Sequence, residues 1–238
     1  MKRPSWTLTV VMVIGAAIFG IGFGHYQWFP YRPLRLVVAR EWPRTTTEKY
    51  IRARTTFFRQ MEGSADVVML GDSLTESGGD WREFFPDFVV QNWGISGDTT
   101  EGVLGRLDEV IGRKPKVVAV LIGINDVRAG IDPAKIIFGI EEILRRIKAS
   151  GTVPIMQSIL LTNNEPDTNA AVARINTTIA AWCAEEKITF LNLNRVLAPF
   201  GILDQTTSTD GIHLNYTGYL RWSATLYPEL RRALAAGG

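Results

Sequence analysis

A serine, a histidine and an aspartate in this sequence have the types and spacing that nucleophilic catalysis requires. Ser73 lies in the segment of residues 71–75 (GDSLT), and Asp210 precedes His213 by three residues. A serine hydroxyl is a weak nucleophile unless a base accepts its proton, and a third group must hold that base in the right tautomer. We therefore expect Ser73 to be the nucleophile, His213 the base and Asp210 the residue that orients the imidazole.

The small numbers of histidine and cysteine residues limit the catalytic and metal sites that the chain can form. The chain holds two histidines, His25 and His213, and one cysteine, Cys183. Because His25 lies in an apolar N-terminal stretch, imidazole chemistry in the globular part must use His213. A single cysteine excludes an intramolecular disulfide and a Cys-rich metal framework, and two separated histidines exclude a zinc site built on clustered imidazoles. We expect a reaction without metal or cofactor, and Cys183 to be a small core residue.

A tetrahedral intermediate also needs hydrogen-bond donors aimed at its developing negative charge. Ser73 stands where an apolar run turns into the next segment, so its backbone N–H can supply one donor. The backbone N–H of Gly94 and the side-chain amide of Asn125 are two further candidates. We expect these three groups to form an oxyanion hole.

Short apolar runs alternate along the chain with longer amphipathic ones, and the two kinds indicate strands and helices. Strands are predicted at 67–70, 89–92, 117–122, 154–159 and 188–191, and helices at 100–111, 133–149, 169–186 and from Tyr216 to about Ala235. Several strand runs are apolar without alternation, as in parallel strands covered on both faces. Strand alternating with helix predicts a doubly wound α/β sandwich.

The polar turns follow the strands, and in such sheets ligands bind beyond the carboxyl ends of the strands. Residues 71–75, 92–100 and 123–127 each follow one of the first three strands, so we expect them to converge with residues 210–215. Each turn also has a local interpretation, in which Ser73, Asn125 and Asp210 merely cap turns or helices. Asp72 and Asp126 are expected to accept backbone N–H bonds, and residues 98–100 to cap the helix that follows.

The four segments resemble, in order, the conserved blocks of the SGNH or GDSL family of serine esterases and lipases. The resemblance rests on GDSLT at 71–75, Gly94, GIND at 123–126 and DGIHL at 210–214, and NWGISGDTT and DGIHLNYTGY are most similar to the platelet-activating-factor acetylhydrolase-like branch. It implies a three-layer α/β/α sandwich of the flavodoxin-like kind with a mostly parallel five-stranded sheet. It also implies a Ser73, His213 and Asp210 triad with Ser73, Gly94 and Asn125 as oxyanion donors.

The substrate expected from this resemblance is a small-molecule or glycan-borne ester with a short acyl group, such as an O-acetylated carbohydrate. A lysophospholipase or thioesterase acting on lipid acyl esters is the alternative that a membrane location favours. The same triad could also pass the acyl group to a sugar hydroxyl, as an O-acyltransferase that modifies a polysaccharide. A non-enzymatic anchored scaffold would leave the four segments idle. The sequence does not indicate an oligomeric state.

Charge is distributed unevenly along the chain. Residues 1–60 carry ten Lys and Arg against two acidic residues, whereas residues 61–238 carry sixteen against twenty-two. An acidic body without a basic face is a poor binder of nucleic acid, because phosphate neutralisation needs clustered Lys and Arg. The basic arm indicates a membrane instead.

The N-terminal region has the composition of a membrane anchor or signal segment. Residues 8–24 are 17 uncharged, mostly apolar residues preceded by Lys2 and Arg3, which is near the lower limit for a spanning helix. We expect segment 1–28 to be a retained transmembrane anchor and the catalytic domain to be extracytoplasmic, with secretion after cleavage before His25 as the alternative. Residues 29–44, with three prolines, are expected to be a linker, and residues 45–238 the hydrolase domain.

Overall fold

The computed structural model describes residues 49–60 and 63–236. A helix of residues 49–60 precedes the first strand, and a compact unit begins within that helix at Ala53. No helix in these two described ranges is long and apolar enough to cross a membrane. The predicted anchor segment 1–28, with its apolar centre at 8–24, and the predicted linker at 29–44 lie outside the described residues.

Five parallel strands form one sheet in the order β2-β1-β3-β4-β5. The strands are β1 (Val67–Gly71), β2 (Val90–Gly94), β3 (Val117–Leu121), β4 (Val153–Gln157) and β5 (Thr189–Leu191). Every residue of β1 and β3 is buried, which explains their uninterrupted apolar sequences. The five-stranded parallel sheet confirms the predicted α/β class.

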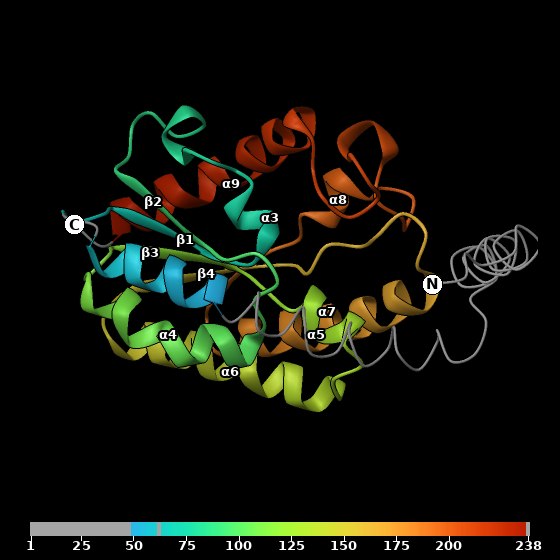
Figure 1. The fold of residues 1–238 in the computed structure, drawn as a ribbon, viewed down its shortest axis with the longest axis horizontal. Helices are drawn as coiled ribbons and strands as arrows, with labels where there is room; N and C mark the ends of the chain where they lie inside the picture. The colour runs from blue at the N-terminus through green and yellow to red at the C-terminus, as the bar shows by residue number, and fades with distance from the viewer. Residues whose placement is uncertain (1–48, 61–62, 237–238) are drawn as a thin grey trace, which may run out of the picture. The chain divides into compact units, whose positions relative to one another are not determined.

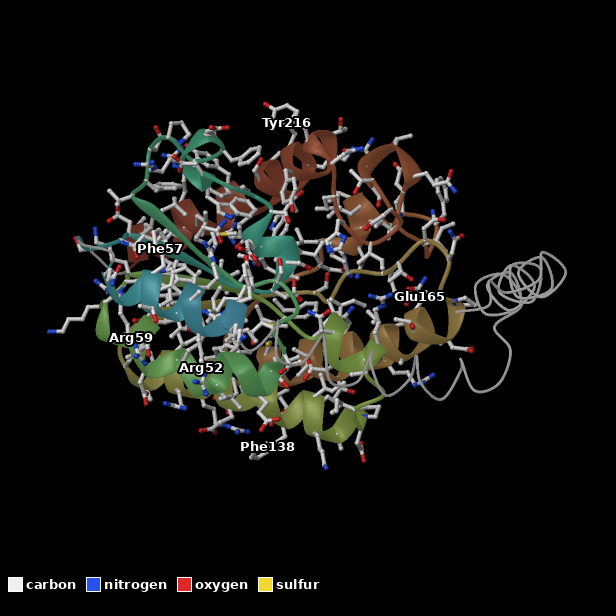
Figure 2. The ribbon with its side chains drawn as sticks, viewed as in Figure 1. Arg52, Phe57, Arg59, Phe138, Glu165 and Tyr216 are labelled. Carbon is white, nitrogen blue, oxygen red and sulfur yellow. The ribbon has the colours of Figure 1, made fainter. Side chains whose placement is uncertain are left out.

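Helices cover both faces of the sheet, so the fold has three layers. Figure 1 shows α4 (Thr100–Gly112), α6 (Pro133–Ala149) and α7 (Pro166–Glu185) on one face and α9 (Tyr216–Ala236) on the other. Shorter helical turns join these elements: α3 (Ser73–Glu76), η1 (Trp81–Glu83), α5 (Ile124–Arg128), α8 (Asn194–Leu197) and η2 (Gln205–Thr207). Exposed aromatic side chains are scattered, since Phe57, Phe138 and Tyr216 project from three different helices (Figure 2).

Several predicted boundaries differ from the structure by one to three residues, and two of these differences have an identifiable reason. β2 runs to Gly94, two residues beyond the predicted end, because Trp93 is an inward-facing strand residue that stacks on Phe58 at 4.5 Å between ring centroids. α7 starts at Pro166 rather than residue 169, since proline is favoured at the first helical position. Cys183 is buried within α7, as predicted.

Candidate active site

Ser73 is placed by the tight junction between β1 and α3. Gly71 ends the strand, and a Cβ atom there would lie 2.2 Å from the carbonyl oxygen of Leu121 on the neighbouring strand, so no other residue fits. Asp72 is the N-cap of α3, and its Oδ1 accepts a hydrogen bond from the backbone N–H of Leu74 at 3.0 Å. Ser73 is the first residue of α3, so its own backbone N–H has no partner within the helix.

His213 contacts Ser73 although 140 residues separate the two in the sequence. The Nε2 atom of His213 lies 3.0 Å from Ser73 Oγ, and its Nδ1 atom lies 2.7 Å from Asp210 Oδ2. The other carboxylate oxygen of Asp210 accepts the backbone N–H groups of Ile212 and His213, at 2.9 and 2.7 Å. The structure therefore brings Ser73, His213 and Asp210 into one hydrogen-bonded chain.

The charge of Asp210 determines which nitrogen atom of the His213 imidazole carries a proton. The hydrogen bond from His213, together with two backbone N–H groups, lowers the pKa of Asp210 to about 2. An ionised carboxylate only accepts hydrogen bonds, so the Nδ1 atom of His213 carries a proton and donates it to Asp210. The Nε2 atom is then left as an acceptor for the hydroxyl of Ser73, as nucleophile activation requires.

The tight turn of residues 208–214 holds the histidine in place. Ser208 and Leu214 form an isolated antiparallel bridge, and Gly211 adopts a φ of +86° that L side chains rarely adopt. The hydroxyl of Ser208 donates to the carbonyl of His213 and accepts from the N–H of Gly211, both at 2.8 Å. These bonds close the turn on both sides of the imidazole.

Asn125 lies beside the turn that follows β2. It is in the first turn of α5, and its amide Nδ2 donates to the carbonyl oxygen of Asp98 at 2.9 Å. An amide carries two N–H bonds, so one remains for another acceptor. Half of the donor capacity of Asn125 is therefore used to hold residues 95–98, and the other amide N–H has no acceptor in the described part of the chain.

Gly94 is a correction to the predicted donor set. Its backbone N–H donates to Asn92 Oδ1 at 2.9 Å, and the residue is buried. A Cβ atom at Gly94 would lie 2.2 Å from the backbone nitrogen of Glu76, so this glycine permits close packing of β2 against α3. Its N–H already has a partner and does not face an open site.

Gly97, which the sequence reasoning did not select, has the properties expected for Gly94. It is exposed, it has a φ of +78°, and its N–H donates to no acceptor in the described part of the chain. The N–H of Asp98 closes the turn onto the carbonyl of Ile95 at 3.1 Å. A signal was present in the sequence, because Ser96-Gly97-Asp98 is itself a turn pattern that provides a glycine with positive φ.

Three carboxylates and one guanidinium are buried beneath these turns. Burial raises the pKa of Asp72 to about 7, against the hydrogen bond from Leu74, and its Oδ2 has no hydrogen-bond partner in the described chain. Burial also raises the pKa of Asp98, although Arg106 lies 2.9 Å away and opposes the shift. The pKa of Asp126 is raised by burial too, while the backbone and hydroxyl of Thr100 donate to it.

These buried acids fulfil the structural roles expected from the sequence. Asp72 and Asp126 accept backbone N–H bonds near strand ends, and Thr99 caps α4 through the N–H of Gly102 at 3.2 Å. Burial lowers the pKa of Arg106, which ties Asp98 to the carbonyl of Gly71 at 3.1 Å. The site therefore rests on a polar layer that links β1, α4 and α5.

A polar cavity of about 270 Å³ adjoins the histidine side of the site. Its lining consists of amide, hydroxyl, glycine and aspartate residues: Asn163, Asn164, Gln205, Ser208, Thr209, Asp210 and Gly211. The loop from β4 is held against this turn because the N–H of Asn163 donates to the carbonyl of Gly211 at 2.8 Å. The cavity shares Asp210 with the hydrogen-bonded Ser, His and Asp, so a ligand that fills it contacts the residue that holds His213.

A parallel α/β sheet that carries a hydrogen-bonded Ser, His and Asp is an arrangement that also occurs in serine hydrolases. A model of the GDSL-like Lipase/Acylhydrolase family matches residues 69–221. The chain belongs to this family, whose members are carboxylic ester hydrolases.

Individual relatives agree with this assignment. The chain is 28% identical over 170 residues to Esterase TesA of Pseudomonas aeruginosa, covering 71% of this chain and 79% of that protein. It is 27% identical over 180 residues to platelet-activating factor acetylhydrolase IB subunit alpha1 of Pongo abelii, covering 71% and 77%. A solved GDSL-like lipase from Bacteroides thetaiotaomicron has the same fold, with a TM-score of 0.70, 23% identity and coverage of 77% of this chain and 98% of that one.

Proposed function

We propose that the protein is a serine esterase in which Ser73, His213 and Asp210 act as a catalytic triad. The observation that carries the proposal is the continuous chain from Ser73 Oγ through both imidazole nitrogens to Asp210, with contacts of 3.0 and 2.7 Å. Its order of donor and acceptor matches the order that proton transfer from a serine requires. The alternative interpretation as unrelated turn caps does not account for the contact between Ser73 and His213.

The reaction has two halves. Ser73 Oγ attacks the ester carbonyl carbon while His213 Nε2 takes its proton, and the C–O bond to the alcohol then breaks as His213 returns that proton to the leaving oxygen. In the second half a water molecule loses a proton to His213 and attacks the acyl group on Ser73. The proton then returns to Ser73 Oγ as the carboxylic acid product leaves. Asp210 stabilises the imidazolium that forms in each half.

Three N–H groups are available to the oxyanion of each tetrahedral intermediate. We assign these to the backbone of Ser73, the backbone of Gly97 and the second N–H of the Asn125 amide. The first two have no acceptor within the described chain, and Asn125 and Gly97 are adjacent through the bond to Asp98. Donors held in advance stabilise charge that develops only in the transition state.

The triad is tested with short p-nitrophenyl esters. Ser73→Ala and His213→Ala should each remove nearly all turnover, and the double variant should lose little more, because the two residues act as a unit. Ser64→Ala, at an exposed serine, serves as the matched control and should retain wild-type kcat. Wild-type kcat in Ser73→Ala would overturn the proposal.

For the substrate we propose a short acyl ester, such as an acetyl ester, of a carbohydrate. His213 protonates the leaving alcohol, so the alcohol part of the substrate lies on the histidine side, where the cavity beside Asp210 is lined by amides and hydroxyls. Such groups can donate hydrogen bonds to the hydroxyls of a sugar and accept hydrogen bonds from them. The short acyl group is supported by the acetyl specificity in the name of the acetylhydrolase relative.

Substrate choice is tested on esters that differ in the alcohol and in chain length. Asn164→Ala and Gln205→Ala, at two exposed cavity residues, should raise KM for an acetylated oligosaccharide and leave KM for p-nitrophenyl acetate unchanged. Activity should fall from acetyl to palmitoyl esters. Equal effects of these variants on both substrates would contradict a sugar in this cavity.

One observation favours a lipid ester as a second candidate. The turn of residues 198–203 exposes Phe200 by 92% and Ile202 by 47%. Asn163 Nδ2 donates to the carbonyl of Leu203 at 2.9 Å, so this turn adjoins the polar cavity. An apolar rim beside a polar cavity suits an amphiphile. In that case Phe200→Ser would lower activity on lysophospholipid micelles and not on soluble acetyl esters.

A further inference from the structure

Glu76 lies in α3, the short helix that begins with the proposed nucleophile, and its side chain is hydrogen-bonded to the turn that follows β2. Its Oε2 atom accepts the backbone N–H of Ser96 at 2.6 Å and the hydroxyl of Ser96 at 2.7 Å. Ser96 immediately precedes Gly97, whose N–H is a proposed oxyanion donor. One carboxylate oxygen therefore fixes the peptide group next to that donor.

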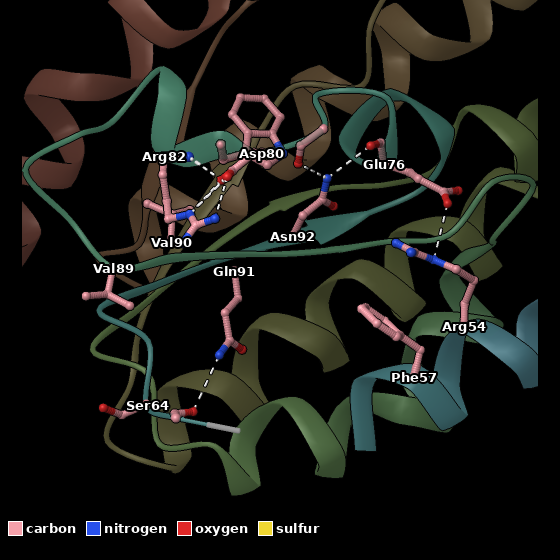
Figure 3. A pocket seen from close by; sticks show the side chains of 13 residues that line it. Arg54, Phe57, Ser64, Glu76, Asp80, Arg82, Val89, Val90, Gln91 and Asn92 are labelled. Atoms are coloured by element: carbon pink, nitrogen blue, oxygen red, sulfur yellow. Dashed lines mark hydrogen bonds and ion pairs between the residues drawn. The ribbon is translucent and has the colours of Figure 1, made fainter. Parts of the chain in front are cut away.

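The other oxygen of Glu76 is held by an arginine from outside the region that the family model matches. Arg54 Nε lies 3.2 Å from Glu76 Oε1, and Arg54 Nη2 donates to the carbonyl of Gly94 at 3.1 Å. The guanidinium lies 4.8 Å from the centroid of the Phe58 ring, so it is oriented by an aromatic face as well. Figure 3 shows Glu76 with Arg54 on one side and Asn92 on the other.

The main chain of Glu76 is tied to the same strand end. Asn92 Nδ2 donates to the carbonyl oxygens of Glu76 and Gly79, at 3.0 and 2.9 Å, while Asn92 Oδ1 accepts the N–H of Gly94. These bonds leave α3 and the end of β2 little freedom to separate. They fix the position of Ser73, the first residue of α3, relative to residues 95–98.

The turn of residues 95–98 is thus held at two points. Glu76 holds Ser96 on the side of α3, and Asn125 holds the carbonyl of Asp98 on the side of α5. Gly97 lies between these two tethers. Loss of either tether would let the Gly97 N–H move away from the position where the oxyanion forms.

We propose that Glu76, held by Arg54, is a positioning residue that fixes the Gly97 N–H relative to Ser73 through its two hydrogen bonds to Ser96. The inference rests on the proposed esterase function. It assigns the helix of residues 49–60 a part in catalysis, although that helix contributes no group that touches the substrate. The side chains of Arg54 and Glu76 are 24% and 16% exposed, so the pair is shielded from solvent more than the surface ion pairs of this chain.

Kinetics on a soluble acetyl ester separate positioning from substrate binding. Glu76→Ala should lower kcat by about 10- to 100-fold with KM changed by less than about 3-fold, because a misplaced donor weakens transition-state contacts more than ground-state contacts. Glu76→Gln keeps an oxygen that can accept from Ser96 and should restore most of the kcat. Affinity for an alkyl boronic acid, which forms a tetrahedral adduct on serine, should fall in parallel with kcat/KM.

Arginines on the same helix provide the matched control. Arg54→Gln should lower kcat several-fold with little change in KM. Arg59→Gln breaks an ion pair to Glu109 of α4 on the surface and should leave both constants unchanged (Figure 2 labels Arg59). Equal effects of the two substitutions, or a fall in thermal stability of Glu76→Ala without a fall in kcat, would overturn the inference.

Amide hydrogen exchange distinguishes failure of this inference from failure of the proposed function. The Ser96 amide should exchange faster in Glu76→Ala than in the wild type, whatever reaction the protein catalyses. Unchanged exchange would overturn the positioning role even in an active esterase. Faster exchange in a protein that shows no Ser73-dependent ester hydrolysis would instead support the contact between Glu76 and Ser96 and overturn the proposed esterase function.

Discussion

At the scale of single residues, the two N–H bonds of the Asn125 amide have different roles, one structural and one proposed to be catalytic. One N–H holds the carbonyl of Asp98 at 2.9 Å, and the other is the proposed oxyanion donor. Removal of such a donor lowers kcat by about 10²–10³, so Asn125→Ala should show that loss with little change in KM. Asn125→Asp should be at least as damaging, because a carboxylate cannot donate and places like charge beside the oxyanion.

The two variants also test the alternative role of Asn125. If it were only a cap, Asn125→Asp would be mild, since aspartate caps about as well as asparagine. Measurement of kcat together with melting temperature for both variants decides between the roles. Wild-type kcat in Asn125→Asp would remove this residue from the oxyanion hole.

Asp72 supports a prediction about pH and stability. Burial raises its pKa to about 7, so the folded state binds a proton between pH 4 and 7 that the unfolded state has lost. Stability from this residue therefore falls as pH rises through that range. Asp72→Asn does not titrate and keeps an oxygen to accept from Leu74, so its stability relative to the wild type should rise by roughly 2–3 kcal/mol from pH 5 to pH 8. Urea denaturation at both pH values measures this difference, and a constant difference would contradict a buried, protonatable Asp72.

Residue types and motif order were enough to predict which serine, histidine and aspartate the fold brings together. They were not enough to choose between Gly94 and Gly97, because the direction of a backbone N–H depends on the turn and on its neighbours. At Gly94 the neighbour is the side chain of Asn92, two residues away, which takes the N–H. The role of Glu76 was equally hidden, since Arg54 and Ser96 are separated from it by about twenty residues on each side.

At the scale of elements, the junction between β1 and α3 tolerates no side chain at Gly71. Gly71→Ala would place a Cβ atom 2.2 Å from Leu121 O, so we expect a loss of about 1–3 kcal/mol in the free energy of unfolding. Gly105→Ala is the matched control, since this exposed position in α4 has open space around its Cβ. There alanine should stabilise by about 0.5–1 kcal/mol. Equal changes at both glycines, measured by chemical denaturation, would contradict the packing of this junction.

Periodicity predicted the long elements because each buries a regular face. The amphipathic pattern predicted the observed bounds of α6, Pro133–Ala149, and the apolar runs predicted strands at β1 and β3 without indicating the order of strands in the sheet. Short helices such as α3 and α5 were not predicted, since four or five residues are too few for a periodic pattern. Their existence depends on Asp72 as a cap and on Gly123, with a φ of +128°, at the preceding turn.

At the scale of the whole molecule, a membrane anchor at residues 8–24 remains a prediction. If the segment is retained, full-length protein should stay with membranes through high-salt and carbonate washes. A chain that begins at Thr45 keeps the helix that carries Arg54 and should be released from membranes with its esterase activity intact. A mature N-terminus at His25 would instead show that the segment is cleaved.

The central claim is that Ser73 is the nucleophile of an ester hydrolase, and a covalent label tests it most directly. Wild-type protein should react with an alkyl fluorophosphonate to give one adduct, located on Ser73 by peptide mass spectrometry, with loss of ester hydrolysis in proportion to labelling. His213→Ala should label much more slowly, because the serine loses its base. Ester hydrolysis by wild-type protein that survives complete labelling of Ser73, or an adduct on a different residue that abolishes activity, would contradict the account.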